Sequence, residues 1–319
     1  MTSKIPHYLL TGGAGFIGSH VAEKLLSMNC RITIVDNLDP FYDKSIKLKN
    51  LAGIQNNANA TVIIKDILDE ELYINDLQDH YDGIIHLAAK AGVRPSIANP
   101  LVYQDVNIKG TQYLLEFAKK KDINTFIFAS SSSVYGVNKK LPWSESDSVL
   151  LPISPYASTK VSCELLGHVY SMLYNMRFIA LRFFTVYGPR QRPDLAIHQF
   201  SKKLLAGKPL PFYGDGSSRR DYTFVDDIVD GVISALHYDQ SNYEVFNLGN
   251  NQTISLSEMV QTIEETFGMK ATLDMLPAQP GDVPITYASV DKANLLLGYK
   301  PRVGFKDGVR VFKDWLIQQ

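Results

Sequence analysis

Short apolar runs alternate with longer amphipathic segments along roughly the first 180 residues of the chain. The apolar runs show little internal alternation with polar residues, which is typical of strands covered on both faces of a parallel sheet. The pattern therefore predicts an α/β fold with a doubly wound parallel sheet. The predicted strands are 7–11, 31–36, 61–66, 83–89, 125–130 and 177–184, and the predicted helices are 17–28, 103–120 and 156–174.

The composition changes after Gly188, where turn-rich stretches such as "AGKPLPFYGDGSSRRD" separate short elements. These stretches are too irregular to continue the sheet in a simple way. We expect residues 1–188 to form the main domain and 189–319 to form mainly a smaller C-terminal α/β lobe. A segment near 222–252, with a strand around 246–251, is expected to return to the main domain.

The overall composition excludes several classes of protein. With 319 residues, 20% charged residues and a net charge of −1, the chain has no basic excess for nucleic acid or an anionic membrane surface. No apolar run reaches about 18 residues, so no membrane span is predicted. Two distant cysteines and seven scattered histidines indicate neither a disulfide framework nor a metal site. A cytoplasmic location is expected.

A glycine-rich turn, "TGGAGFIG" at 11–18, follows the first predicted strand and opens the first predicted helix. Glycine allows a tight turn and a close approach of the backbone to a pyrophosphate, which then lies at a helix N-terminus. The turn therefore predicts a dinucleotide site. The residues expected there are Gly12, Gly15, Phe16, Ile17 and Gly18.

The second and third predicted strands each end in an aspartate. Asp36 lies 18 residues after Gly18, where a carboxylate can accept both hydroxyls of the adenosine ribose. Asn37 follows with no arginine for a 2′-phosphate, so the sequence favours NAD over NADP. Asp66 and Ile67 are placed to meet the adenine, although a surface aspartate capping a loop explains Asp66 equally well.

The stretch "ISPYASTK" places Tyr156 and Lys160 four residues apart in a predicted helix that follows a serine-rich strand end. Side chains with this spacing share a helix face, so Lys160 is expected to lower the pKa of the phenol. A phenolate suits hydride transfer because it removes an alcohol proton while the hydride passes to NAD. A second pair, Tyr135 and Lys139, crosses a turn at Gly136, where this spacing does not align side chains.

Together, "TGGAGFIGSH", "HLAA" (86–89), "SSSSVYG" (130–136) and the Tyr-Lys pair resemble the extended short-chain dehydrogenase/reductase family of nucleotide-sugar epimerases and dehydratases. The resemblance covers essentially the whole chain and implies a Rossmann-type NAD-binding domain. It implies that Tyr156 is the base, that Lys160 tunes it and binds the nicotinamide ribose, and that Ser131 supplies a hydroxyl. It also implies cofactor contacts from Ala88, Ala89 and Asn107, and a homodimer formed through two long helices of each subunit.

Two missing acids narrow the implied reaction. Dehydratases of this family carry Asp-Glu where this chain has Ser132 and Ser133, and UDP-xylose-forming decarboxylases place a glutamate in a stretch that has none here. The remaining chemistry is oxidation at C4, rotation of the 4-keto sugar and return of the hydride to its other face. This reaction is a 4-epimerization of a UDP-sugar that regenerates NAD in each cycle.

The segment "LRFFTVYGPRQRPDLAI" (181–197) resembles the subfamily that acts on UDP-glucuronate. A carboxylate at C6 needs hydroxyl donors and a cation. Arg192 is the leading cation, although a solvated loop arginine is the alternative, and Arg94 is a second candidate. The hydroxyl candidates are Ser132, Ser133 and Thr185.

The resemblance also implies that the UDP moiety lies in the C-terminal lobe. Phe212 or the backbone beside it is expected to pack the uracil, Arg220 to bind the pyrophosphate and Asp282 to bind the ribose. Two alternatives remain open: an epimerase of UDP-glucose or UDP-N-acetylglucosamine, and a non-catalytic NAD-binding regulatory protein. Proteins of the second kind typically lose the tyrosine or the lysine, and this chain has both.

Overall fold

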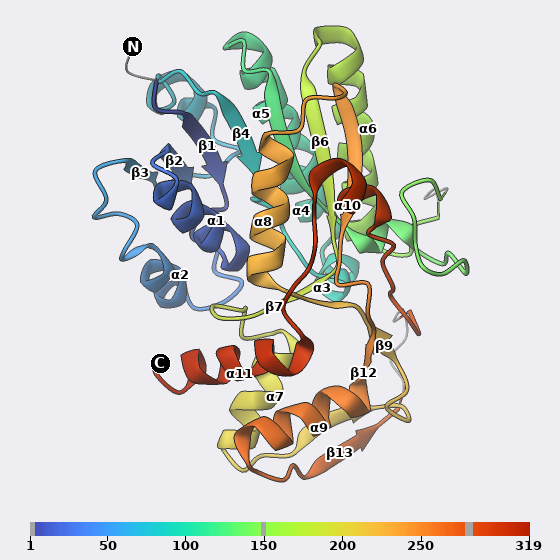
Figure 1. Cartoon of the computed structure of the whole chain (residues 1–319). Coiled ribbons are helices and arrows are strands. Elements are labelled where there is room, and N and C mark those ends of the chain that lie inside the picture. Colours follow the sequence, from blue (N-terminus) through green and yellow to red (C-terminus); the bar gives the residue numbers. More distant parts are fainter. Residues whose placement is uncertain (1–3, 148–150, 278–282) are drawn as a thin grey trace.

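The computed structural model describes residues 4–147, 151–277 and 283–319. Its central sheet has seven strands in the order β11-β6-β5-β4-β1-β2-β3, and every neighbouring pair is parallel (Figure 1). This topology confirms the predicted doubly wound α/β fold. The strands are β1 (His7–Thr11), β2 (Arg31–Val35), β3 (Ala60–Ile63), β4 (Gly83–His86), β5 (Thr125–Ser131), β6 (Arg177–Phe183) and β11 (Tyr243–Leu248).

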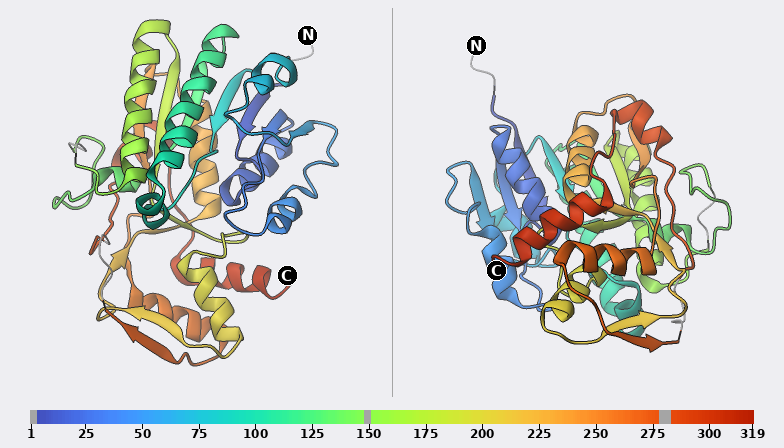
Figure 2. Two further views of the ribbon diagram at one scale, coloured as in Figure 1. Left: turned by 180° about the vertical axis from the view of Figure 1, so that it is seen from behind. Right: turned by 60° about the horizontal axis from the view of Figure 1, so that its bottom comes forward.

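Helices cover both faces of this sheet. On one face α1 (Phe16–Ser27) packs against α8 (Val225–Leu236), and on the other α5 (Gly110–Lys120) packs against α6 (Pro155–Tyr174) (Figures 1 and 2). The helix predicted over 103–120 is divided into three parts. These are α4 (Pro100–Tyr103), the π-helical turn η2 (Gln104–Lys109) and α5.

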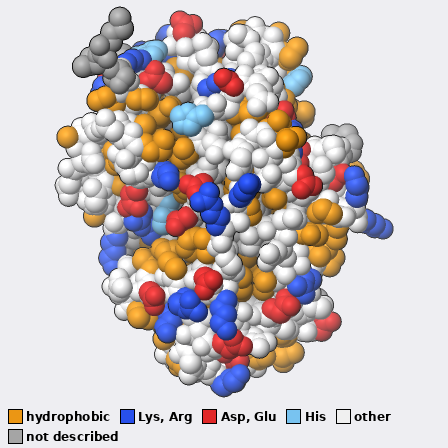
Figure 3. All heavy atoms as spheres, in the orientation of Figure 1, with side chains coloured by type: hydrophobic (Ala, Val, Ile, Leu, Met, Phe, Trp, Pro, Cys, Tyr) orange, Lys and Arg blue, Asp and Glu red, His pale blue; other side chains and the backbone are white. Residues whose placement is uncertain are grey.

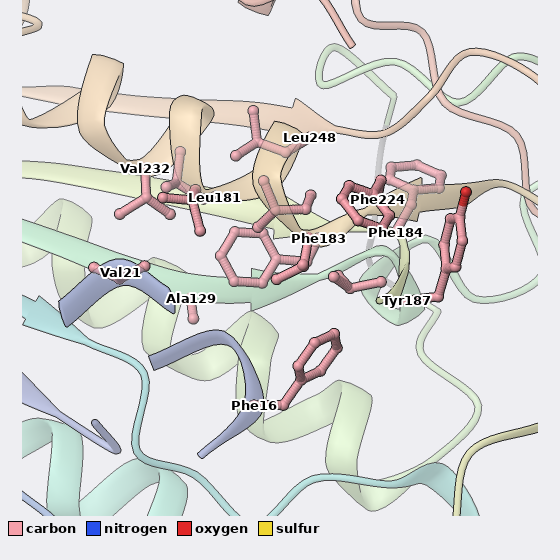
Figure 4. Close-up of a cluster of buried hydrophobic side chains, with 14 of the residues drawn as sticks. Phe16, Val21, Ala129, Leu181, Phe183, Phe184, Tyr187, Phe224, Val232 and Leu248 are labelled. Atoms are coloured by element: carbon pink, nitrogen blue, oxygen red, sulfur yellow. The ribbon is translucent and has the colours of Figure 1, made fainter. Parts of the chain in front are cut away.

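The main core lies between β6, its neighbouring strands and the helices α1 and α8 (Figure 4). The strands here are apolar at nearly every position because helices cover both of their faces. Full burial of one such side chain contributes roughly 1.5–3 kcal/mol. The labelled members are Phe16 and Val21 of α1, Ala129 of β5, Leu181 and Phe183 of β6, Phe184, Tyr187 of β7 (Thr185–Tyr187), Phe224 of β10 (Tyr222–Phe224), Val232 of α8 and Leu248 of β11.

The remaining C-terminal elements form a smaller group below the carboxyl ends of the strands (Figure 1). Three two-stranded pairs, β7 with β10, β8 with β13 and β9 with β12, connect its helices. These elements are α7 (Ala196–Leu205), β8 (Leu210–Tyr213), β9 (Arg219–Arg220), β12 (Ile254–Ser255), α9 (Leu256–Phe267), β13 (Leu273–Leu276) and α11 (Phe305–Leu316).

The chain passes between the two parts more than once. After β6 it enters the lower group, then returns through α8 and β11, and β11 pairs with β6 at the edge of the main sheet. It returns again at α10 (Asp291–Leu297), which packs against α8 and β11. The strand expected around 246–251 is therefore β11, which begins earlier, at Tyr243. The domain boundary at residue 188 stays a prediction.

Basic and acidic side chains are interspersed over the face shown in Figure 3. In the described part of the chain no helix has the length and apolarity needed to cross a bilayer. Among the same residues, no group of three or more His, Cys, Asp or Glu side chains is arranged to hold a metal ion.

Candidate active site

A cavity of about 580 Å³ opens at the carboxyl edge of the sheet. Its wall combines the turn between β1 and α1, the ends of β2, β4 and β5, the first turn of α6 and parts of the segment 183–195. Parallel sheets place strand ends from distant parts of the sequence at one edge, and ligands bind there. The glycine turn and the Tyr156–Lys160 pair therefore line one continuous space.

The turn between β1 and α1 requires glycine because neighbouring atoms leave no room for a Cβ. Gly12 has φ +75°, and a Cβ there would lie 2.6 Å from the backbone nitrogen of Ala88. A Cβ on Gly18 would lie 2.1 Å from the carbonyl oxygen of Gly12. Helix α1 begins just beyond, and its N-cap Gly15 makes no side-chain capping bond. The exposed backbone at a helix N-terminus fits the pyrophosphate of a dinucleotide. Gly12, Gly15, Phe16, Ile17 and Gly18 all line the cavity.

Asp36 is buried in the cavity wall at the end of β2. Its carboxylate accepts backbone hydrogen bonds from Ala14 (3.0 Å) and Leu38 (2.8 Å). Lys47 Nζ lies 3.9 Å from Asp36 Oδ1 and was not identified from the sequence. Burial lowers the pKa of Lys47, and the charge of Asp36 opposes that shift. Lys47 is one of three lysines in α2 (Lys44–Leu51), and only the packing of this helix shows which lysine faces inward.

Asn37, Asp66 and Ile67 also line the cavity. Asn37 Nδ2 donates to Asp66 Oδ2 (2.7 Å), and the backbone nitrogen of Leu68 donates to Asp66 Oδ1 (2.9 Å). The first bond joins the segments that follow β2 and β3, and the second fixes the turn after β3. Asp66 therefore has a structural partner on each carboxylate oxygen in addition to its place in the wall.

The structure places Asn107 behind the wall. Ala88 and Ala89 line the cavity, whereas Asn107 is buried and does not. Its amide accepts from the backbone nitrogen of Lys90 (2.8 Å) and donates to the Lys90 carbonyl (3.0 Å) and to Thr159 Oγ1 (2.9 Å). Asn107 thus ties the segment after β4 to helix α6, and its expected contact with the cofactor stays a prediction.

Helix α6 begins as the sequence predicts. The Ser154 hydroxyl accepts from the backbone nitrogen of Ala157 (3.1 Å), and Pro155 occupies the first turn. Tyr156 follows at once, and its backbone nitrogen donates to Ser96 Oγ (3.1 Å). The capped first turn fixes the Tyr156 side chain at the mouth of the cavity, facing the end of β5.

Lys160 is only 3% exposed, and its ammonium group donates to the carbonyl oxygen of Ala129 (2.7 Å). Its Nζ lies 4.8 Å from the ring centroid of Phe128 and 5.8 Å from that of Tyr156. Burial lowers the pKa of Lys160 to about 8, while Cys163 and Glu164 act in the opposite direction.

Burial raises the pKa of Tyr156, and two neighbours lower it: a hydrogen bond with Ser131 and the positive charge of Arg192. The sequence interpretation gave the lowering role to Lys160. In the structure the Lys160 ammonium donates to a carbonyl of β5, and Arg192 is a further cation, whose charge lowers the pKa of the phenol. The tuning role of Lys160 stays a prediction.

The first two residues of the serine run, Ser130 and Ser131, line the cavity, and the next two do not. Ser131 lines the cavity and shares a hydrogen bond with Ser133 (Oγ–Oγ 2.6 Å). Ser132 and Ser133 begin the short 3₁₀ helix η3 (Ser132–Tyr135) and are absent from the cavity wall. Tyr135 is buried, and its hydroxyl donates to Asn247 Oδ1 (2.7 Å), so this tyrosine has a structural role.

Thr185 and Arg192 lie in the cavity wall opposite the glycine turn. The Arg192 guanidinium binds both carboxylate oxygens of Asp194, at 2.9 and 2.7 Å, and lies 5.1 Å from the ring centroid of Phe41. Asp194, only two residues away, was not identified from the sequence. The pair shows that this guanidinium is oriented to hold a carboxylate in a bidentate manner.

Two residues expected around UDP, Phe212 and Arg220, lie outside this cavity wall, and so does Arg94, the second candidate cation for the carboxylate. Phe212 is buried in the core, which leaves the neighbouring backbone rather than its ring for a base. Arg220 lies on β9 and donates to the Arg219 carbonyl (2.9 Å), and Arg94 lies 5.9 Å from the ring centroid of Tyr213. Asp282 lies outside the described residues.

Comparison with known proteins gives consistent matches over nearly the whole chain. Residues 9–312 match the family described as GDP-mannose 4,6 dehydratase. A UDP-glucuronate 4-epimerase of Thermodesulfobacterium geofontis is 38% identical, and the match covers 97% of this chain and 95% of that protein.

Two solved structures have the same fold throughout. UDP-glucuronic acid 4-epimerase from Bacillus cereus, solved with UDP-glucuronic acid and NAD, has a TM-score of 0.91 and 38% identity, covering 98% of this chain and 99% of the other. UDP-N-acetylglucosamine 4-epimerase from Methanobrevibacter ruminantium M1, solved with UDP-N-acetylmuramic acid, has a TM-score of 0.91 and 32% identity. That match covers 99% of each chain.

Proposed function

The chain belongs to the GDP-mannose 4,6-dehydratase family, a branch of the extended short-chain dehydrogenases/reductases, and within it we propose that it is an NAD-dependent UDP-glucuronate 4-epimerase. The observation that carries this proposal is that Arg192 lines the same cavity as Tyr156, with its guanidinium held in a bidentate contact by Asp194. It places a carboxylate-binding cation beside the catalytic phenol. The two UDP-glucuronate 4-epimerases named above, similar over nearly the whole chain, support the same activity.

NAD is the cofactor, and the glycine turn with Asp36 fits it. When bound, NAD accepts and returns a hydride at its nicotinamide ring. We propose that Gly12, Gly15 and Gly18 hold the pyrophosphate and that Asp36 holds the adenosine ribose. The buried carboxylate of Asp36 disfavours a 2′-phosphate because two negative charges would share one site.

Tyr156 Oη takes the proton of the substrate's C4 hydroxyl during oxidation and gives it back after rotation. Ser131, which already hydrogen-bonds the phenol, orients this proton transfer. Arg192 favours the phenolate by its charge. Lys160 holds the end of β5 and the Tyr156 ring in place. It also lines the cavity wall where the cofactor ribose is expected.

Arg192 also recognises the 6-carboxylate of UDP-glucuronate, assisted by the Thr185 hydroxyl. The guanidinium is already paired with Asp194, so a substrate carboxylate shares or replaces that partner. A neutral sugar leaves the pair intact and gains no charged contact. The 6-carboxylate is therefore expected to strengthen binding.

The family name does not imply dehydration in this chain. Elimination of water requires an additional acid near the catalytic phenol, and Ser132 and Ser133 stand at the positions where the dehydratases carry Asp-Glu. Within the described residues the cavity wall near Tyr156 contains Ser130 and Ser131 but no glutamate. Without that acid the 4-keto sugar is not dehydrated, and we expect it to be reduced again, from one face or the other.

Incubation of the purified protein with UDP-glucuronate, UDP-glucose and UDP-N-acetylglucosamine in parallel tests the activity, with products resolved by anion-exchange chromatography. We expect UDP-galacturonate from the first substrate. Arg192→Met should raise KM for UDP-glucuronate by about 10- to 100-fold, the loss of one charge-assisted bidentate contact. Arg310→Met serves as the matched control because Arg310 lies on α11 and does not line this cavity. Turnover of a neutral sugar alone would overturn the assignment.

A 4-epimerase of neutral or N-acetylated UDP-sugars is the second candidate. It is favoured by the structural likeness to the UDP-N-acetylglucosamine 4-epimerase, which has the same fold over nearly its full length. The parallel incubation separates the two activities. The Arg192→Met variant separates them again, because KM for a neutral sugar should not depend on the guanidinium.

We further propose that the protein is a homodimer in the cytoplasm. The outward face of α6 carries four exposed apolar side chains at helical spacing, Leu165, Val169, Met172 and Leu173. An apolar stripe of this kind is typical of a helix that packs against another helix. The described cysteines, Cys30 and Cys163, are both free and buried thiols, which suits a reducing compartment.

A further inference from the structure

A second cavity, of about 730 Å³, lies between α2, α7, α11 and Arg190. These three helices come together near the C-terminus, below the main sheet (Figure 1). The cavity shares no lining residue with the catalytic cavity, although Arg190 lies two positions before Arg192. No step of the epimerization described above uses it.

Buried polar atoms without partners gather beside this cavity. The described residues contain six such side-chain atoms, and four of them belong to residues between 190 and 201. Buried polar groups are normally paired, so a local excess of unpaired groups indicates a missing partner. The four are Arg190 Nη1, Gln191 Oε1, His198 Nε2 and Ser201 Oγ.

His198 shows most clearly that this is a built site. It is 2% exposed and lines the cavity, and its Nδ1 is 2.5 Å from the carbonyl oxygen of Gln191. Because a carbonyl only accepts, Nδ1 carries the proton and donates it. Trp315 packs edge-on against the imidazole at 5.7 Å between ring centroids. The ring is therefore fixed on one side, and its opposite nitrogen, Nε2, is left without a partner.

The charged side chains in the cavity wall are all positive. Lys49, Arg190 and Lys202 line it, and no aspartate or glutamate does. Arg190 Nη2 binds Glu23 Oε1 (2.6 Å), which leaves Nη1 unpaired. Within the described residues, Lys49 and Lys202 take part in no ion pair. Clustered cations in a concave site with an apolar wall attract anions.

We propose that this cavity is a second ligand site, for an organic phosphate. The phosphate would lie among Lys49, Lys202 and the Arg190 guanidinium, and a small shift of neighbouring side chains would open the buried Arg190 Nη1 and His198 Nε2 to it. Trp315 and Leu205, which also line the cavity, offer an apolar surface to the organic part. A phosphate suits three converging cations because it carries up to two charges and several acceptor oxygens.

Titration calorimetry with phenyl phosphate as the probe tests this site. NAD and UDP are present at saturation so that the catalytic cavity does not bind the probe, and sodium chloride keeps the ionic strength constant. We expect one equivalent to bind. The double variant Lys49→Gln/Lys202→Gln should weaken binding by about tenfold or more. Both lysines are exposed on helix surfaces, so the variant should keep its fold, as thermal unfolding will verify.

Lys203→Gln is the matched control, because Lys203 lies on the same helix but does not line the cavity. Its affinity for phenyl phosphate should equal that of the unmodified protein. Equal weakening in both variants, or no binding at all, would overturn the proposal and leave water as the partner of the unpaired atoms. Inorganic phosphate is titrated in parallel, and equally tight binding of it would rule out a contribution from the apolar wall.

Discussion

Tyr156 illustrates how much of a catalytic residue's character comes from neighbours distant in the sequence. Burial alone makes its phenol a weaker acid, whereas Ser131 and Arg192 oppose that effect from two different segments. Lys160, its neighbour on the same helix, donates to a carbonyl of β5. The ability of the phenol to exchange a proton thus depends on the segment 183–195 reaching the cavity.

At the residue scale, Tyr156→Phe is expected to lower kcat for UDP-galacturonate formation by about 10²- to 10⁴-fold, because the proton acceptor is removed. Product formation by anion-exchange chromatography measures this loss. The affinity for NAD, followed by fluorescence titration, should change little.

Tyr135→Phe is the control for this variant. Its hydroxyl bonds Asn247 and lies beside Arg182, and Tyr135 does not line the catalytic cavity, so the change should cost about 0.5–1.5 kcal/mol of unfolding free energy with kcat retained. Equal losses of kcat in the two variants would contradict the assignment of Tyr156.

At the scale of elements, His86 joins strand β4 to strand β1 and to helix α5. It lies at the end of β4, and its two ring nitrogens contact Thr11 Oγ1 of β1 (2.6 Å) and Thr111 Oγ1 of α5 (3.0 Å). Burial, reinforced by the charge of Lys160, lowers the pKa of His86 to about 3. The imidazole therefore stays neutral when the protein is folded and becomes protonated near pH 6.5 only when it is unfolded.

Since the unfolded chain binds the extra proton between about pH 6.5 and pH 3, the unfolding free energy falls as the pH is lowered through this window. For His86 alone the loss is about 1.4 kcal/mol per pH unit once the pH is well below 6.5. His86→Gln keeps a donor and an acceptor but does not titrate, so it should lack this part of the slope. Urea unfolding at pH 7, 6 and 5 measures the difference, and identical slopes would refute it.

The crossover from β1 to α1 yields a second prediction at this scale. Gly18→Ala places a Cβ 2.1 Å from the Gly12 carbonyl oxygen, so the turn must shift. We expect a loss of about 1–3 kcal/mol in unfolding free energy and at least a tenfold loss in NAD affinity. Gly53→Ala is the control, because its Cβ meets no atom within 4 Å. Unchanged NAD affinity in Gly18→Ala would contradict the placement of the pyrophosphate.

For the whole molecule, the apolar stripe on α6 is a property of the surface rather than of the core. Leu165→Glu combined with Met172→Glu puts two charges into that stripe and should convert a dimer into monomers, which sedimentation velocity will detect. Leu295→Glu is the control: Leu295 is 80% exposed on α10, whose helix packs against α8 on the other face of the sheet. A dimer that survives the double change would place the interface elsewhere.

The sequence predicted the long strands of the main sheet well but did not predict the short strands of the lower group. The strands of the main sheet lie within one to three residues of their predicted ranges, because buried parallel strands leave uninterrupted apolar runs. β7 and β9 have three and two residues, too few for any periodicity to appear. The π-helical turn η2 does not interrupt the apolar pattern of residues 103–120, so the sequence pattern could not predict it.

The sequence by itself determined what local spacing controls: the glycine turn, the aspartates at the strand ends, and Tyr156 in a capped first turn of a helix. Tertiary structure alone decided that the charge of Arg192 acts on Tyr156, that Asp194 holds Arg192, that Asn107 stands behind the wall, and that a second cationic cavity exists. The physical reason is that interactions fall off steeply with distance. The distance between segments far apart in the chain is set by how helices and strands pack, and the order of residues does not record it.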